Sequence, residues 1–244
     1  MSTSANFIAH LIELRVRLLH SVIALLLVFV CLFPWASELY ELLAQPLLAK
    51  LPEGGQMIAT DVTTPFFVPL KVALMSAFLI ALPYILYQVW QFVAPGLYAH
   101  EKRLVVPFII ISTMLFFCGM AFAYFMVFPI VFGFITASAP AGVAVMTDID
   151  KYLGFVLAMF MAFGITFQVP VAVVALVYMG VVTIEKLRIA RPYVVVGAFV
   201  AGAILTPPDV VSQFMLAMPL WLLYEAGIVV AGWLGERETE RAGD

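Results

Sequence analysis

The chain has 244 residues, of which 65% are hydrophobic and 11% are charged, and its mean hydropathy is +1.11. Soluble globular proteins carry about a quarter charged residues, so this chain lacks the polar side chains that would cover a globule in water. Its apolar runs are long and continuous, whereas membrane β-barrels give short alternating segments. The composition excludes an ordinary soluble domain and predicts an all-α integral membrane protein.

Six apolar windows predict six transmembrane helices, because crossing about 30 Å of hydrocarbon takes about 20 apolar residues. They cover residues 18–34, 70–90, 104–128, 152–179, 192–205 and 210–234. The first has no small-residue cleavage site after it, so we expect a retained span. Prolines at 192, 207 and 208 bound the fifth window, so the fifth and sixth spans are expected to be short. The whole chain is interpreted as a single membrane domain, residues 1–244.

The basic residues predict the orientation of these spans. With the N-terminus inside, nine of the 12 Lys and Arg residues lie in inner segments. These are Arg15, Arg17, Lys102, Arg103, Lys186, Arg188, Arg191, Arg237 and Arg241. The three in outer segments are Lys50, Lys71 and Lys151. The positive-inside rule then places both termini in the cytoplasm.

Between the first two spans, Leu39, Tyr40, Leu42 and Leu43 recur at helical spacing. This pattern predicts a short amphipathic helix at the membrane interface. It is expected to end near Pro46 because proline disfavours a continuing helix.

Polar side chains gather in two inner segments. His10, Glu13 and Arg17 are spaced i, i+3 and i+7, so they share one face of a helix. A surface ion pair between Glu13 and Arg17 is the plain structural interpretation. The inner loop of residues 90–103 holds more aromatic and charged residues than a turn requires.

Several ordered motifs resemble the TatC family, the multi-spanning receptor subunits of twin-arginine protein translocases. They are HLIELRVRL from His10, FVAPGLY from Phe92 with Glu101 after it, GMAFAY from Gly119, RPY from Arg191 and TPPD from Thr206. The resemblance covers about residues 7–233. It implies a cup-shaped six-helix protein of the bacterial inner membrane that binds twin-arginine signal peptides on its cytoplasmic side. It also implies single-span TatA- and TatB-type partners in an oligomeric complex, with export of folded proteins driven by the proton-motive force.

The resemblance also implies the residues that bind the signal peptide. By their place in the motifs, Glu101 is the principal carboxylate and Glu13 assists, while Phe92, Arg15 and Leu18 shape the same site. The chemistry agrees, because a carboxylate accepts two parallel bonds from a guanidinium and an ammonium cannot reproduce that fork.

Four polar residues lie within or beside the apolar windows. Gln168 is in the middle of the fourth span, where an amide usually bonds a neighbouring helix; the resemblance implies contact with a partner's transmembrane helix. Thr206 and Gln213 flank the TPPD turn and resemble a polar patch where partner helices dock. Glu225 lies inside the sixth span, so it is either a functional residue or a paired structural one.

Other classes of protein fit the residues less well. A net charge of −3 without a clustered basic face gives no indication of a nucleic-acid partner. No serine, histidine and acid arrangement and no metal-ligand spacing appears, so neither an enzyme nor a cofactor or metal is expected. A small-solute transporter or a non-transporting membrane scaffold stays open as an alternative.

Overall fold

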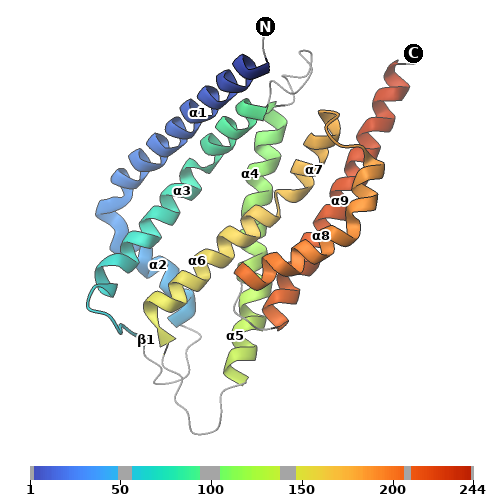
Figure 1. Ribbon diagram of the computed structural model, residues 1–244. Coiled ribbons are helices and arrows are strands. Elements are labelled where there is room, and N and C mark those ends of the chain that lie inside the picture. Colours follow the sequence, from blue (N-terminus) through green and yellow to red (C-terminus); the bar gives the residue numbers. More distant parts are fainter. Residues whose placement is uncertain (1–2, 49–56, 94–104, 138–146, 206–209, 243–244) are drawn as a thin grey trace. The chain divides into compact units, whose positions relative to one another are not determined.

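The computed structural model describes residues 3–48, 57–93, 105–137, 147–205 and 210–242 (Figure 1). Nearly all of these residues are helical. The helices are α1 Thr3–Leu32, α2 Ala36–Leu48, α3 Thr64–Val93, α4 Val105–Phe122, α5 Phe128–Ala137, α6 Ile149–Thr166, α7 Val169–Tyr178, α8 Ile184–Leu205 and α9 Val210–Ala242. Strands β1 Met57–Ile58 and β2 Thr147–Asp148 pair in parallel.

Six segments of the described chain are long and apolar enough to cross a membrane, which confirms the six predicted helices. They are Ile8–Leu42, Thr64–Val93, Val106–Gly133, Ile149–Tyr178, Ile184–Ile204 and Gln213–Leu234. The last two have 21 and 22 residues and are shorter than the other four, as the sequence predicts.

The fifth span begins earlier than the sequence suggests. Pro192 lies inside α8, and this helix of 22 residues starts at Ile184. At about 1.5 Å per residue it is about 33 Å long, so the predicted window of residues 192–205 is too short for the helix itself. Membrane helices tolerate an internal proline because neighbouring groups satisfy the freed carbonyl. The apolar window began at Pro192 because charged residues fill the first two turns.

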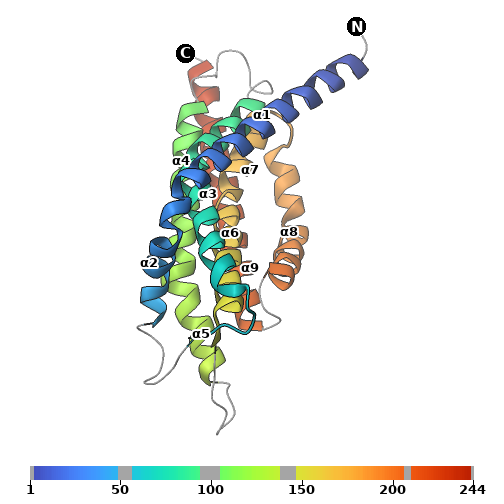
Figure 2. The same ribbon diagram turned by 90° about the vertical axis from the view of Figure 1, so that its left-hand side faces the viewer.

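The residues sort into two compact units. Unit 1 comprises Met1–Pro95 and Ala141–Gly154, and unit 2 comprises Gly96–Pro140 and Phe155–Asp244. In unit 1, α1 and α2 pack along α3, as both views show (Figure 1 and Figure 2). Small buried residues of α3, Ala73, Ala77 and Ala81, allow helices to approach closely. The helix predicted after the first span is present as α2, although it continues past Pro46 to Leu48.

In unit 2, α9 packs against both α7 and α8. The core between them is formed by Val173, Leu187, Tyr224 and Ile228. The chain leaves α7 at Gly180, which has a φ of +67° that glycine adopts without a steric penalty. The amide N–H groups of Gly180 and Val181 donate to the carbonyls of Val177 and Leu176, which is the Schellman pattern of a helix C-terminus.

Two interruptions divide the third and fourth spans. A π-helical turn at Ala123–Val127 separates α4 from α5 and precedes Pro129, which lacks the N–H of a regular helix. α6 ends at Thr166, and Gln168 is the N-terminal cap residue of α7. Pro170 explains this second break, because its ring would clash with the carbonyl four residues earlier, while the second position of a new helix accepts it.

Candidate functional site

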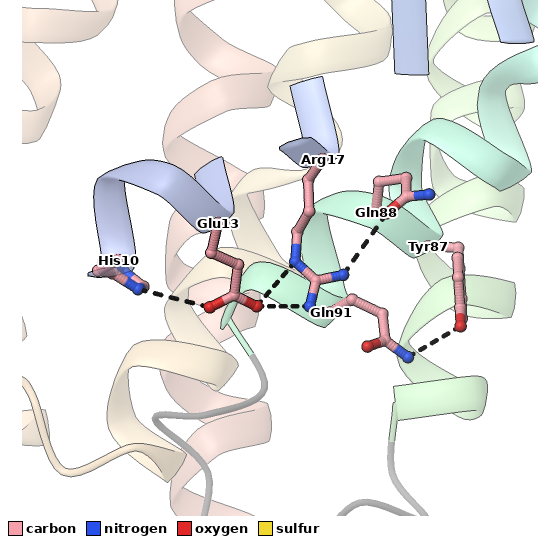
Figure 3. Close-up of polar contacts among 6 residues, drawn as sticks. All are labelled: His10, Glu13, Arg17, Tyr87, Gln88 and Gln91. Carbon is pink, nitrogen blue, oxygen red and sulfur yellow. Dashed lines mark hydrogen bonds and ion pairs between the residues drawn. The ribbon is translucent and has the colours of Figure 1, made fainter. Parts of the chain in front are cut away.

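Polar side chains of unit 1 gather where α1 begins and α3 ends (Figure 3). Four of them, together with the ring of Phe92, form what we call the Glu13 cluster: His10, Glu13, Arg17, Gln88 and Phe92. The first three lie on consecutive turns of α1, as their spacing predicts. The other two come from the last two turns of α3.

The centre of the Glu13 cluster is an ion pair within α1. Arg17 donates to Oε1 of Glu13 through Nε at 3.0 Å and through Nη2 at 2.5 Å. The side chains are 21% exposed for Arg17 and 34% for Glu13, so the carboxylate is partly shielded but accessible. This confirms the pair that the i, i+4 spacing predicts.

Gln88 connects this pair to α3. Its Oε1 accepts from Nη1 of Arg17 at 3.5 Å, and its Nε2 donates to the hydroxyl of Tyr84 at 2.7 Å. The side chain is buried. A buried amide is costly unless it is bonded on both sides, so these two contacts fix its orientation.

His10 connects Glu13 to Phe92. Its Nδ1 lies 3.9 Å from Oε2 of Glu13, and its ring stacks on that of Phe92 with centroids 4.2 Å apart.

Of the five residues expected to bind a signal peptide, the structure thus brings Glu13 and Phe92 to one place. Arg15 and Leu18 are exposed on α1, and the described residues show no hydrogen bond or ion pair between them and the cluster. Glu101 lies outside the described residues.

Unit 2 holds a second ion pair, inside the apolar segments. Nη2 of Arg191 on α8 donates to Oε2 of Glu225 on α9 at 2.6 Å. Glu225 is 23% exposed and Arg191 46%. Nearby, the hydroxyl of Tyr224 donates to the carbonyl of Leu187 at 2.9 Å. Glu225 is therefore paired, which is one of the two interpretations its position allowed.

The amides singled out in the sequence bond within unit 2. Nε2 of Gln168 donates to the backbone carbonyl of Ser112 on α4 at 2.9 Å, so it joins two helices as a membrane-buried amide is expected to. Nε2 of Gln213 on α9 donates to the carbonyl of Phe199 on α8 at 2.8 Å. Thr206 lies outside the described residues.

At the other end of α3, four side chains of unit 1 form what we call the loop cluster: Thr60, Lys71, Asp148 and Asp150. Lys71 Nζ pairs with Asp150 at 2.6 Å. The Thr60 hydroxyl and amide donate to Asp148, which also caps α6 by accepting from the amides of Asp150 and Lys151. The Thr60 hydroxyl, then the backbone N–H groups, lower the pKa of Asp148 to about 2 because they stabilise the charged form.

Sequence analysis missed Gln88 and the whole loop cluster. Gln88 interrupts an apolar window, and a polar residue at such a position is itself an indication of function. The pairs Thr60–Asp148 and Lys71–Asp150 join distant segments, so local spacing carries no indication of them. The described residues hold no group of three or more His, Cys, Asp or Glu side chains suited to a metal ion.

These features define a six-span helical membrane protein with a polar cluster where α1 begins and α3 ends. Residues 9–219 match the family of Sec-independent protein translocase proteins, TatC. The chain is 56% identical over 221 residues to the TatC protein of Escherichia coli strain K12, covering 91% of this chain and 86% of that protein. It is 54% identical to that of Azotobacter chroococcum, covering 97% and 93%.

The fold agrees with a solved structure as well. A crystal structure of the twin-arginine translocase receptor TatC superposes with a TM-score of 0.81 at 41% identity, covering 92% of this chain and 98% of that one. The chain belongs to the TatC family. It is a multi-pass bacterial membrane protein and a component of a protein translocase.

Proposed function

We propose that this chain is the receptor subunit of a twin-arginine translocase and that it binds the arginine pair of signal peptides at the Glu13 cluster, together with Glu101. The observation that carries the proposal is the accessible Glu13 carboxylate next to the ring of His10, which stacks on that of Phe92. A carboxylate next to an aromatic face suits a guanidinium, which bonds the first and stacks on the second.

The site is completed by residues that the family resemblance implies. Glu101 follows Phe92 in the chain and supplies the second carboxylate for the second arginine. Arg15 and Leu18 follow Glu13 on α1, and the exposed Leu18 offers apolar area to the hydrophobic part of a signal peptide. Burial of that part contributes affinity in proportion to area, and the carboxylates contribute specificity.

The proposed orientation places both termini and the Glu13 cluster on the cytoplasmic side of the bacterial inner membrane. The excess of Lys and Arg in the corresponding segments supports it. The loop cluster then lies on the outer side.

We further propose that single-span TatA- and TatB-type proteins bind this subunit in an oligomeric complex that moves folded proteins using the proton-motive force. Gln168, Thr206 and Gln213 are the proposed contacts for their transmembrane helices. Gln168 and Gln213 each use one amide N–H within this chain, and an amide has a second N–H and a carbonyl available for another partner. Gln168 cannot titrate, so any proton-linked step must use other groups.

The test is binding of the purified full-length protein in detergent to a synthetic signal peptide with Arg-Arg, against the same peptide with Lys-Lys. The two peptides carry equal charge, so a preference for Arg-Arg reports the bidentate geometry. Glu13→Gln is expected to weaken Arg-Arg binding about tenfold or more, because a charge-assisted bond contributes about 1.5 to 3 kcal/mol.

Glu185→Gln is the matched control, since Glu185 is an exposed carboxylate in the first turn of α8. It removes the same charge outside the cluster and is expected to leave both affinities unchanged. Equal binding of the two peptides, with no response to Glu13→Gln or Glu101→Gln, would refute the proposed site.

A further inference from the structure

The carboxylate of Glu13 is occupied in the free protein. One oxygen, Oε1, accepts two bonds from Arg17, and Nδ1 of His10 lies 3.9 Å from the other oxygen, Oε2. Arg17 thus already supplies this carboxylate with a guanidinium, the group that a peptide arginine would bring, although both of its bonds go to one oxygen and not to two. A cation that approaches Glu13 meets a nearly neutral pair, so its attraction is weakened.

We propose that Arg17 is an internal competitor for the arginine-binding carboxylate and that Gln88 is the acceptor to which its guanidinium moves when a peptide arginine takes Glu13. This inference rests on the proposed function. It assigns Arg17 and Gln88 a role in regulating the affinity of that same site.

The geometry favours Gln88 as the receiving group. Its Oε1 already lies 3.5 Å from Nη1 of Arg17, a longer contact than either bond to Glu13. Gln88 is buried, and its Nε2 bonds the hydroxyl of Tyr84. This leaves its carbonyl oxygen to face Arg17, as Figure 3 shows. A small movement of the guanidinium can therefore strengthen one contact as it leaves the other, without exposing a buried polar group.

Competition of this kind has a distinct effect on affinity. The apparent dissociation constant equals the intrinsic constant divided by the fraction of protein whose site is open. Opening the Glu13–Arg17 pair is the same step for every ligand. Arg17 must therefore weaken binding of an Arg-Arg and a Lys-Lys peptide by one common factor and leave their ratio unchanged.

The experiment measures binding of both peptides to the purified full-length protein by titration calorimetry. Arg17→Leu is expected to tighten both about two- to fivefold, the factor that corresponds to a partly exposed ion pair. Arg17→Gln serves as a second variant if the first does not fold. Gln88→Leu in the native background is expected to weaken both about fivefold, because the displaced Arg17 then lacks an acceptor.

The decisive comparison places Gln88→Leu in the Arg17→Leu background, where it is expected to have no effect. This non-additivity is the signature of two residues that act on each other. Gln91→Leu is the matched control. Gln91 lies one turn further along α3 and bonds the hydroxyl of Tyr87 at 2.9 Å. Its replacement removes the same kind of amide bond and is expected to change neither affinity in either background.

Three results would overturn the inference. Arg17→Leu could weaken binding or leave it unchanged. Gln88→Leu could weaken binding equally in both backgrounds, which would make Gln88 a direct peptide contact. Gln88→Leu could leave binding unchanged in both backgrounds, which would mean that Arg17 lowers affinity only by repelling the positive charge of the peptide. Failure of the proposed function is seen separately, as native binding that does not respond to Glu13→Gln.

Discussion

Replacing Gly119 with alanine tests the packing of unit 2 at a single atom. Gly119 on α4 faces α6 so closely that an added Cβ would lie 2.5 Å from the backbone oxygen of Phe163 and 3.0 Å from the ring of Phe167. The ring can rotate, but the oxygen belongs to a buried helix backbone. It also accepts the amide N–H of Phe167 at 2.9 Å, in the last turn before the break between α6 and α7.

The expected cost follows from these contacts. Forcing one methyl group into a packed core destabilises proteins by about 1 to 3 kcal/mol. This cost includes any weakened backbone hydrogen bond, which is worth about 0.5 to 1.5 kcal/mol. The intrinsic preference of helices for alanine over glycine, up to about 1 kcal/mol, acts in the opposite direction. We therefore expect Gly119→Ala to lower the free energy of unfolding by about 1 to 2 kcal/mol.

The assay is denaturant unfolding in detergent micelles, followed by circular dichroism. Gly197→Ala is the matched control, because Gly197 lies within α8 and an added Cβ there meets nothing within 4 Å. The control is expected to be neutral or slightly stabilising. If Gly119→Ala proved as stable as Gly197→Ala, the close crossing of α4 and α6 would be refuted.

Two further predictions concern charged groups. The pKa of Asp148 is lowered to about 2 from its ordinary value of 3.8, so its stabilisation is present above about pH 4 and is lost as the pH falls toward 2. Asp148→Asn should accordingly lower the melting temperature at pH 6 and have a shrinking effect below pH 4; an equal effect at both pH values would contradict the shift. Arg191→Leu, which leaves Glu225 unpaired in an apolar segment, is expected to destabilise unit 2 by about 1 to 3 kcal/mol. The double variant Arg191→Leu with Glu225→Leu should recover part of this loss of stability, as measured by thermal unfolding. A double variant less stable than either single variant would refute the pairing.

The elements that sequence predicted are those governed by local chemistry. Six spans follow from hydropathy, α2 follows from its apolar spacing, and the Glu13–Arg17 pair follows from the i, i+4 geometry of one helix. The start of α8 was misplaced because the helix continues through Pro192, which a membrane helix tolerates, whereas hydropathy registers only its apolar part.

The elements that sequence did not predict depend on distant partners. Nothing near Gln88 in the chain indicates that Arg17 will face it, because that contact exists only after α1 packs on α3. The same holds for Glu225, whose partner Arg191 was counted only as a charge that sets orientation. Spacing within one helix is readable from sequence, while the register between two helices is determined by packing over their full length.

The pairing of β1 with β2 has a consequence for biosynthesis. Unit 1 is discontinuous in the chain, since the segment Ala141–Gly154 belongs with Met1–Pro95. The ribosome therefore delivers α1, α2 and α3 well before the strand and the carboxylates that complete their unit. Asp148 and Asp150 reach Thr60 and Lys71 only after the whole of α4 and α5 has been synthesised. An N-terminal fragment ending at α5 would keep the α1–α3 packing but would have no β2 and neither carboxylate of the loop cluster.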